Sequence, residues 1–445
     1  MDWPSIIQIS HFARCGFVER LKDPHIVCPV IVGLLTRYSS NYEYPDHVNN
    51  HTKNEKKIRI CLLHILATYA RIFYFDTVQI LSNQSFICSI NSIFEIAIDE
   101  NHKDKTSETE ILLSLIVFHL IEREQPMLCR VANKSGLLDR LIQIFNKPND
   151  ECLTVRIKSA VLRTIIRLIR ISSKAASSSW IKLKKQVIDS IFSDDISMRI
   201  WGLKYVLTVI KMIEVNSKEG LALECIQPLQ LCPSIFVLMY DECVPVRQQS
   251  ILTICRIIIS HENEKECTQL VYMGVIGLLL DVLKQNELMN YTNHIAIPVL
   301  ISLNKLVKHS EKWAFILINS KGIDTILSYL KYPAENIIIA VILLLFNVSN
   351  HSSFHTNKVL EFKTLHKLHR IKEIVNSNEF TRIIGKVIYS LIMMCTEYEI
   401  LHSFIMNSGD SQIIENESIQ IHLKLIQKSF TKLQKFMDSN VKMKY

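Results

Sequence analysis

Three arginines recur at helical spacing in the middle of the 445-residue sequence. Arg163, Arg167 and Arg170 are four and three residues apart, so a helix would place them on one face. Arginine offers a planar fork of N–H donors that suits carboxylate and phosphate groups. Lysines nearby could extend these arginines into a basic patch, namely Lys158, Lys182, Lys184 and Lys185. The pattern predicts either a site for an acidic peptide or phosphate group, or a solvated helix face paired with local carboxylates.

Histidines also recur at spacings that could bring two imidazoles together. The pairs are His47/His51, His351/His355 and His366/His369. None has the intervening glutamate of a helical zinc site, and the 12 cysteines contain no CxxC pair. We therefore expect surface or loop histidines, and cysteines that act as small core residues in a reducing compartment. No metal site or catalytic constellation is predicted, since the many Ser, His and Asp residues follow no recognisable arrangement.

Glycine is scarce, with 10 residues in 445, where average usage is roughly 7%. Phosphate-binding loops and nucleophile elbows need glycine where the backbone turns sharply, and none of their motifs occurs. We expect no enzyme, no cofactor and no small-molecule substrate. The formal net charge of +8 permits an acidic partner without requiring one.

A turn of the same kind precedes three apolar helices. An aspartate is followed within a few residues by a hydrophobic residue and an arginine in Asp150 to Arg156, Asp195 to Arg199 and Asp241 to Arg247. The aspartates lie 45 and 46 residues apart. Aspartate at such a turn can cap the amides of the next helix, and the arginine can reach back to carbonyls or acidic groups. The spacing indicates an internal repeat.

A second repeating pattern is a short helix that ends at glycine, followed by an aliphatic helix. The short helices are Leu128 to Ser135, Thr268 to Met273 and Ile316 to Lys321, and the glycines are Gly136, Gly274 and Gly322. Glycine readily takes the left-handed conformation that closes a helix. Each pair is followed by a long third helix, predicted at Val155 to Arg170, Asn293 to His309 and Ala334 to Asn350.

Together these patterns resemble the armadillo repeat over about residues 108–396, and the two-helix segments around Arg199 and Arg247 resemble HEAT repeats. The resemblance implies an all-α fold, a right-handed α–α superhelix, with partners bound on a concave surface formed by the third helices. Asn304 and Asn347 take equivalent places in two third helices. In the family, asparagine there often binds the backbone of an extended peptide; alternatively, each satisfies a neighbouring backbone group.

The nuclear-import receptors of that family add a tryptophan one turn before each such asparagine. This sequence has Leu300 and Leu343 at those places, so an import-receptor peptide groove is not expected.

The whole chain is predicted to be one armadillo-like domain, 1–445. It would have irregular N-terminal helices over 1–107, its clearest repeats over 108–396, capping helices over 397–437 and a basic tail over 438–445. The serine-rich stretch Ser172 to Ser179 is predicted as a hinge or exposed loop. Near the end, an apolar stripe from Leu423 to Met437 faces away from four lysines, which suits a capping helix or a helix docked on an acidic surface.

The longest apolar run, Ile337 to Phe346, is ten residues, well short of the roughly 20 that span a bilayer. No signal peptide is visible, so we expect a cytoplasmic or nuclear location. The predicted function is a non-enzymatic scaffold or adaptor that binds one or more proteins. The alternatives are a structural subunit of a stable centriolar, ciliary or nuclear assembly, or a nucleic-acid-binding basic solenoid.

Overall fold

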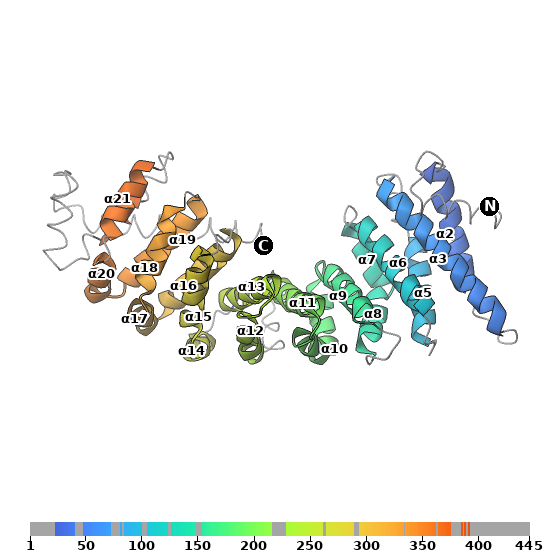
Figure 1. Ribbon diagram of the computed structural model, residues 1–445, viewed down its shortest axis with the longest axis horizontal. Helices are drawn as coiled ribbons and strands as arrows, with labels where there is room; N and C mark the ends of the chain where they lie inside the picture. Colours follow the sequence, from blue (N-terminus) through green and yellow to red (C-terminus); the bar gives the residue numbers. More distant parts are fainter. Residues whose placement is uncertain are drawn as a thin grey trace. The chain divides into compact units, whose positions relative to one another are not determined.

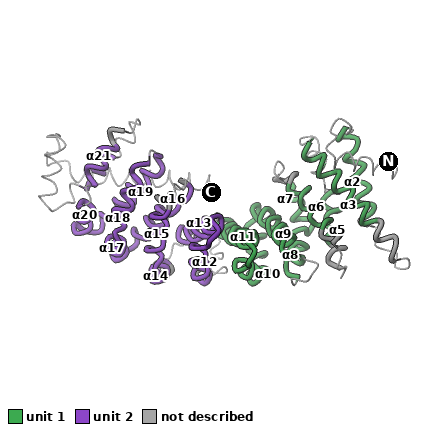
Figure 2. Tube along the Cα trace, in the orientation of Figure 1, with its two compact units in different colours: residues 1–227 green, residues 228–445 purple. Residues whose placement is uncertain are grey.

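A computed structural model describes most of the chain between residues 23 and 374. The described segments are 23–40, 48–72, 84–99, 105–122, 126–147, 154–215, 228–260, 264–288, 293–332, 334–361 and 364–374, with Leu81 and a few positions between 384 and 391. Every regular element within them is a helix (Figure 1). They form two compact units, residues 1–227 and 228–445 (Figure 2). No helix in these segments is long and apolar enough to span a membrane.

Unit 1 stacks its helices in two rows. In one row α2 packs on α5, α5 on α8 and α8 on α10; in the other α3 packs on α6, α6 on α9 and α9 on α11. The bounds are α2 Pro24–Ser40, α3 Val48–Ile72, α5 Gln84–Asp99, α6 Lys105–Glu122, α7 Pro126–Lys134, α8 Leu137–Asn146, α9 Val155–Ile169, α10 Ser173–Ile191 and α11 Ile196–Val215. Aliphatic side chains fill the space between the rows, as the long apolar runs predict.

Unit 2 repeats a triplet of two short helices and a long one. The long helices α13, α16 and α19 pack side by side, and α17 packs on α20 (Figure 1). The bounds are η3 Pro228–Leu231, α12 Cys232–Leu238, α13 Val244–Ser260, α14 Glu264–Tyr272, α15 Val275–Leu288, α16 Asn293–His309, α17 Glu311–Asn319, α18 Gly322–Ser328, η4 Tyr329–Lys331, α19 Glu335–Ser349, α20 Ser353–Leu360 and α21 Thr364–Ile374. The triplets α7–α9, α14–α16 and α17–α19 confirm the predicted armadillo-like repeat and all-α class.

Glycine closes two of the three predicted short helices. Gly136 and Gly274 both have φ of 84°, the left-handed conformation that was predicted. At the third turn the prediction is wrong, because Lys321 takes that conformation, with φ of 55°, and Gly322 begins α18. Gly322 is needed for space instead: a Cβ there would lie 2.6 Å from the backbone carbonyl oxygen of Leu317.

One of the two described aspartate turns confirms the capping prediction. Asp195 accepts a hydrogen bond from the amide of Met198 in the first turn of α11, at 2.8 Å. Asp241 accepts one from the amide of Cys243 at 2.8 Å, and Cys243 precedes α13, so the capping prediction is wrong for Asp241. Arg199 and Arg247 then donate back to carbonyls of their own turns, at 2.9 Å to Ser193 and 2.6 Å to Asp241. These arginine bonds thus tie the first turn of each helix to the loop that precedes it. Asp150 lies outside the described residues.

The serine-rich stretch is helical, so its prediction as a hinge or exposed loop is wrong. Ser172 caps α10 by accepting from the amide of Ala175 at 3.3 Å. Ser179 is buried and accepts a hydrogen bond from the hydroxyl of Tyr205 at 2.9 Å. Next to it the Trp180 ring stacks on Tyr205 with centroids 6.3 Å apart. Small serines let α10 pack closely on α11 while these bonds satisfy their hydroxyls.

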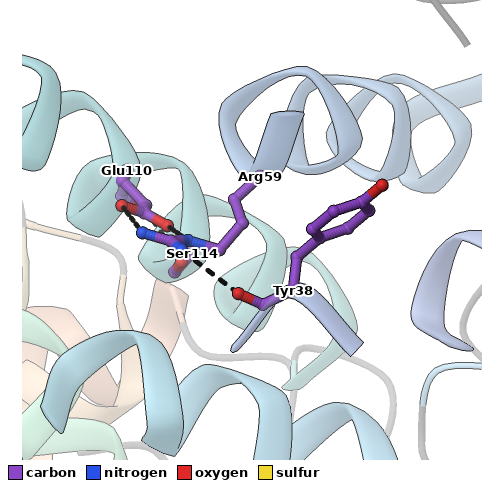
Figure 3. Close-up of polar contacts among 4 residues, drawn as sticks. All are labelled: Tyr38, Arg59, Glu110 and Ser114. Atoms are coloured by element: carbon purple, nitrogen blue, oxygen red, sulfur yellow. Dashed lines mark hydrogen bonds and ion pairs between the residues drawn. The ribbon is translucent and has the colours of Figure 1, made fainter. Parts of the chain in front are cut away.

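A buried ion pair joins three helices of unit 1 (Figure 3). Arg59 on α3 and Glu110 on α6 form a bidentate pair, with exposed fractions of 5% and 3%. The Arg59 guanidinium also donates to the carbonyl of Tyr38 near the end of α2, at 3.2 Å. Removing one member of a buried pair typically costs about 3–5 kcal/mol, because the other charge is left unpaired. This pair therefore fixes the register of α2, α3 and α6.

Several predictions fall outside the described residues. These are the C-terminal capping helices, the stripe from Leu423 to Met437, the basic tail and the beginning of the chain. The single-domain organisation, the superhelical handedness and the HEAT assignment of α10–α13 stay predictions.

Candidate functional site

The predicted arginine stripe lies on the solvent side of α9. Arg163 and Arg170 are exposed and Arg167 is partly buried. The other side of α9 is apolar and buried between the two rows of unit 1. Since α9 packs between α6 and α11, the stripe has one neighbouring helix on each side.

Two residues of α11 complete the stripe. The Arg163 Cζ atom lies 5.4 Å from the centroid of a Trp201 ring, and the Lys204 Nζ atom lies 4.4 Å from the same centroid. Both are cation–π distances. Within the described part of unit 1, no carboxylate forms an ion pair with Arg163 or Lys204. We call Arg163, Arg167, Arg170, Trp201 and Lys204 the basic face.

The cations of the basic face lie close enough to disfavour one another. The pKa of Lys204 is lowered by burial and then by the charges of Arg163 and Arg170. An anion placed among these groups would remove that repulsion.

His119 on α6 borders the basic face and is neutral at physiological pH. Burial, Arg163 and Arg167 lower its pKa to about 4. Its Nε2 atom lies 3.0 Å from the Thr164 hydroxyl, which itself donates to the Ala160 carbonyl at 2.9 Å. The hydroxyl proton is thus used, so His119 donates from Nε2 and carries its lone pair on Nδ1.

Two of the lysines predicted to extend the stripe are held elsewhere. Lys182 on α10 pairs with Asp139 on α8 at 2.7 Å, and Lys158 donates to the Lys147 carbonyl at 2.7 Å. Lys184 and Lys185 also lie on α10. The lysine that lies beside the arginine stripe is Lys204, which contacts the same Trp201 ring as Arg163. The signal in the sequence was the i, i+3 spacing of Trp201 and Lys204 on a predicted helix, which sequence reasoning passed over.

The two predicted asparagines meet in unit 2. Asn347 Nδ2 on α19 donates to Asn304 Oδ1 on α16 at 2.7 Å. The bond joins two side chains, where a bond to a peptide or to a neighbouring backbone group was expected. Leu300 and Leu343, one turn earlier, are buried. A peptide-binding role for the asparagines stays a prediction.

One predicted histidine pair is described with its side chains. The rings of His351 and His355 lie 6.0 Å apart. His351 Nε2 is 2.8 Å from the Val307 carbonyl, and His355 Nδ1 is 2.7 Å from the Ser352 hydroxyl. The His351 contact joins the turn after α19 to α16, and the His355 contact lies within the first turn of α20. His355 is buried on α20, so the expectation of a surface or loop histidine is wrong for it. Among the described residues, no group of three or more His, Cys, Asp or Glu side chains could hold a metal ion.

Comparison with known proteins bears on the fold. No family model matches the sequence, and no curated protein matches it. An engineered protein of known crystal structure has a TM-score of 0.62 at 8% identity, over 96% of this chain and 98% of that one. A designed armadillo repeat protein has a TM-score of 0.47, and armadillo repeat proteins computationally designed for modular peptide recognition have 0.48. Both are 11% identical and cover 57% of this chain and 99% of theirs.

At these identities the likeness concerns the fold alone. The helical triplets α7–α9, α14–α16 and α17–α19 make this chain an armadillo-like repeat protein in architecture.

Proposed function

We propose that this chain is a non-enzymatic binding protein whose unit 1 holds an extended acidic segment of a partner protein on the basic face. The observation that carries the proposal is the placement of Arg163 and Lys204 on one Trp201 ring without a carboxylate ion pair in the described part of unit 1. Complementary charge steers association and favours acidic partners over others.

The basic face is suited to a ligand that crosses several helices. Its residues come from α9 and α11, and His119 adds the edge of α6. Packed helices lie about 8–10 Å apart, so the axes of three neighbouring helices span about 16–20 Å, and a segment crossing them needs at least about five or six extended residues. Trp201 would add apolar contact area to the charged groups, which is how anchors at interfaces commonly combine.

Fluorescence anisotropy with a labelled peptide of alternating Glu and Gly, about twelve residues long, tests the proposal. We expect binding that weakens as salt is raised. Reversing two charges in Arg163→Glu/Lys204→Glu should weaken it at least about tenfold, since each lost charge contact is worth roughly 1 kcal/mol or more. Lys182→Glu/Lys184→Glu on α10 makes the same change of charge away from the basic face and should weaken binding much less.

Failure of the acidic peptide to bind at low salt would contradict the proposal, and so would equal losses in the two double variants. A single-stranded oligonucleotide that binds more tightly than the peptide would replace it with nucleic-acid binding, for which Arg and Trp are also suited.

A second candidate is a structural subunit of a stable assembly in the cytoplasm or nucleus. Large apolar side chains are exposed on α10, α12 and α14, namely Ile181 at 72%, Val237 at 68% and Tyr272 at 87%. Exposed apolar surface is often covered by a permanent partner. Under this candidate the isolated chain should aggregate in gel filtration, whereas an adaptor should elute as one discrete species.

A further inference from the structure

The cations of the basic face share one small area. Arg163 from α9 and Lys204 from α11 lie on the same Trp201 ring, at 5.4 and 4.4 Å from its centroid. The charge of Arg170, the residue that follows the end of α9, also acts on Lys204. Two cations on one ring concentrate positive charge in a smaller area than a basic surface on which lysines are spread apart.

From this gathering we infer that the acidic segment carries a phosphorylated side chain, and that Arg163 and Lys204 bind its phosphoryl group. The inference rests on the proposed function and names the chemical class of its ligand.

The amount of negative charge and the number of acceptor oxygens favour a phosphoryl group over a single carboxylate. A phosphorylated Ser, Thr or Tyr carries about −1.5 to −2 charges at neutral pH and offers three strong acceptor oxygens. A carboxylate carries one charge and two oxygens, so it would leave more of the repulsion among Lys204, Arg163 and Arg170 in place. Guanidinium forks also match phosphate oxygens in pairs, and such bidentate bonds are among the strongest in proteins.

Trp201 prepares two of the cations for a ligand. A cation held on an aromatic face gives up part of its side-chain freedom before binding, so less is lost when the ligand arrives. The ring is apolar and neutralises no charge, in contrast to a carboxylate, which would compete with the ligand. His119 at the border is neutral at physiological pH, so it adds no charge to the basic face.

The experiment compares three labelled peptides that differ at one central position in the same Glu–Gly background: Ser, Glu or phosphoserine. With the full chain, we expect phosphoserine to bind at least about tenfold more tightly than Glu, and Ser more weakly than either. Arg163→Lys keeps the charge and removes the fork; it should reduce the preference for phosphoserine over Glu several-fold. Lys182→Gln on α10 removes a charge outside the basic face and should leave that preference unchanged.

The outcomes separate the inference from the proposed function. If the Glu and phosphoserine peptides bind equally well, the phosphoryl inference is wrong and the proposed function stands. If no peptide binds, the proposed function fails with it. Circular dichroism of each variant confirms that its helices are intact. Inorganic phosphate that binds as tightly as the phosphoserine peptide would assign the cations to a free anion, and a single-stranded RNA that binds more tightly than that peptide would assign them to a nucleic acid; either result would overturn the inference.

Discussion

At the level of single residues, Trp201 contacts two cations without neutralising their charge. Its ring contacts the guanidinium of Arg163 and the ammonium of Lys204, two groups that repel each other. Each cation–π contact is worth about 0.5–1 kcal/mol at an exposed site, comparable to a surface ion pair. An ion pair would have cancelled the charge, whereas the aromatic ring keeps it available. The type of contact therefore matters more for binding than its strength.

His119 makes the stability of unit 1 depend on pH. Its pKa of about 4 lies below the value near 6.5 of an unfolded histidine, so between these values the unfolded chain binds the extra proton. Stability must then fall as pH drops from about 6.5 to 4, by at most about 3 kcal/mol. His119→Gln has no proton to gain, so we expect its free energy of unfolding to fall less over this range in urea titrations at pH 6.5 and 4.5.

His309→Gln is the matched control, because His309 is exposed on α16. It should lose stability between the two pH values as the wild type does. A His119→Gln variant with the wild-type pH dependence would show that His119 stays solvated and titrates normally.

At the level of helices, Gly322 and Gly277 differ in whether an added Cβ atom has room, and alanine variants at the two positions can test this difference. A Cβ at Gly322 would lie 2.6 Å from the Leu317 carbonyl and 3.0 Å from Leu280 Cδ1, so α17, α18 or α15 would have to shift. We expect Gly322→Ala to destabilise unit 2 by about 1–3 kcal/mol. Gly277 lies within α15 with nothing within 4 Å of an added Cβ, so Gly277→Ala should stabilise the chain by up to about 1 kcal/mol.

The midpoint of the urea-induced loss of helical circular dichroism measures both changes. Equal midpoints for the two variants would mean that the α17–α18 turn relaxes without cost, and that close packing does not explain Gly322.

The bounds of the long helices could be predicted from the sequence because the same pattern recurs in successive repeats. The predicted third helix Asn293–His309 has the observed bounds of α16, and the predicted ends of the other two differ from α9 and α19 by one residue. Packing between helices accounts for one of the wrong predictions. The serine-rich stretch, which favours a loop in isolation, is helical in α10, where Ser179 is buried and accepts a hydrogen bond from Tyr205 on α11.

The candidate site was predictable only in part for the same reason. The spacing of Arg163, Arg167 and Arg170 fixes a shared face on one helix. Which groups the next helix brings to that face depends on how the two helices cross, and the sequence does not specify that angle. Lys182 was therefore assigned to the patch on proximity in sequence, although it pairs with Asp139, and Lys204 was overlooked.

On the scale of the whole molecule, side-chain hydrogen bonds join neighbouring repeats within each of the two units. In unit 2, Lys305 donates to the Ile259 carbonyl and Tyr329 to the Leu283 carbonyl, each 46 residues earlier. In unit 1, Thr164 meets His119 at a separation of 45 residues. These separations match the repeat length read from the aspartate turns. Stability in such arrays comes largely from contacts between neighbouring repeats, so changes in one repeat act mainly on its neighbours.

This locality leads to a test of whether the two candidate surfaces act separately. All five residues of the basic face lie in unit 1, while Asn304 and Asn347 lie in unit 2. Asn304→Ala/Asn347→Ala removes both partners of one hydrogen bond and should cost about 1 kcal/mol of stability. Affinity for the Glu–Gly peptide, measured by anisotropy on the full chain, should stay within about twofold of wild type.

A tenfold loss in that variant would show that the peptide also engages unit 2, and the basic face alone would no longer account for binding. Arg163→Glu/Lys204→Glu provides the opposite control, since it should abolish most binding and leave the unfolding of unit 2 unchanged. Only the combination of these two results locates the acidic segment on α9 and α11, because each variant by itself could lose binding through a change in fold.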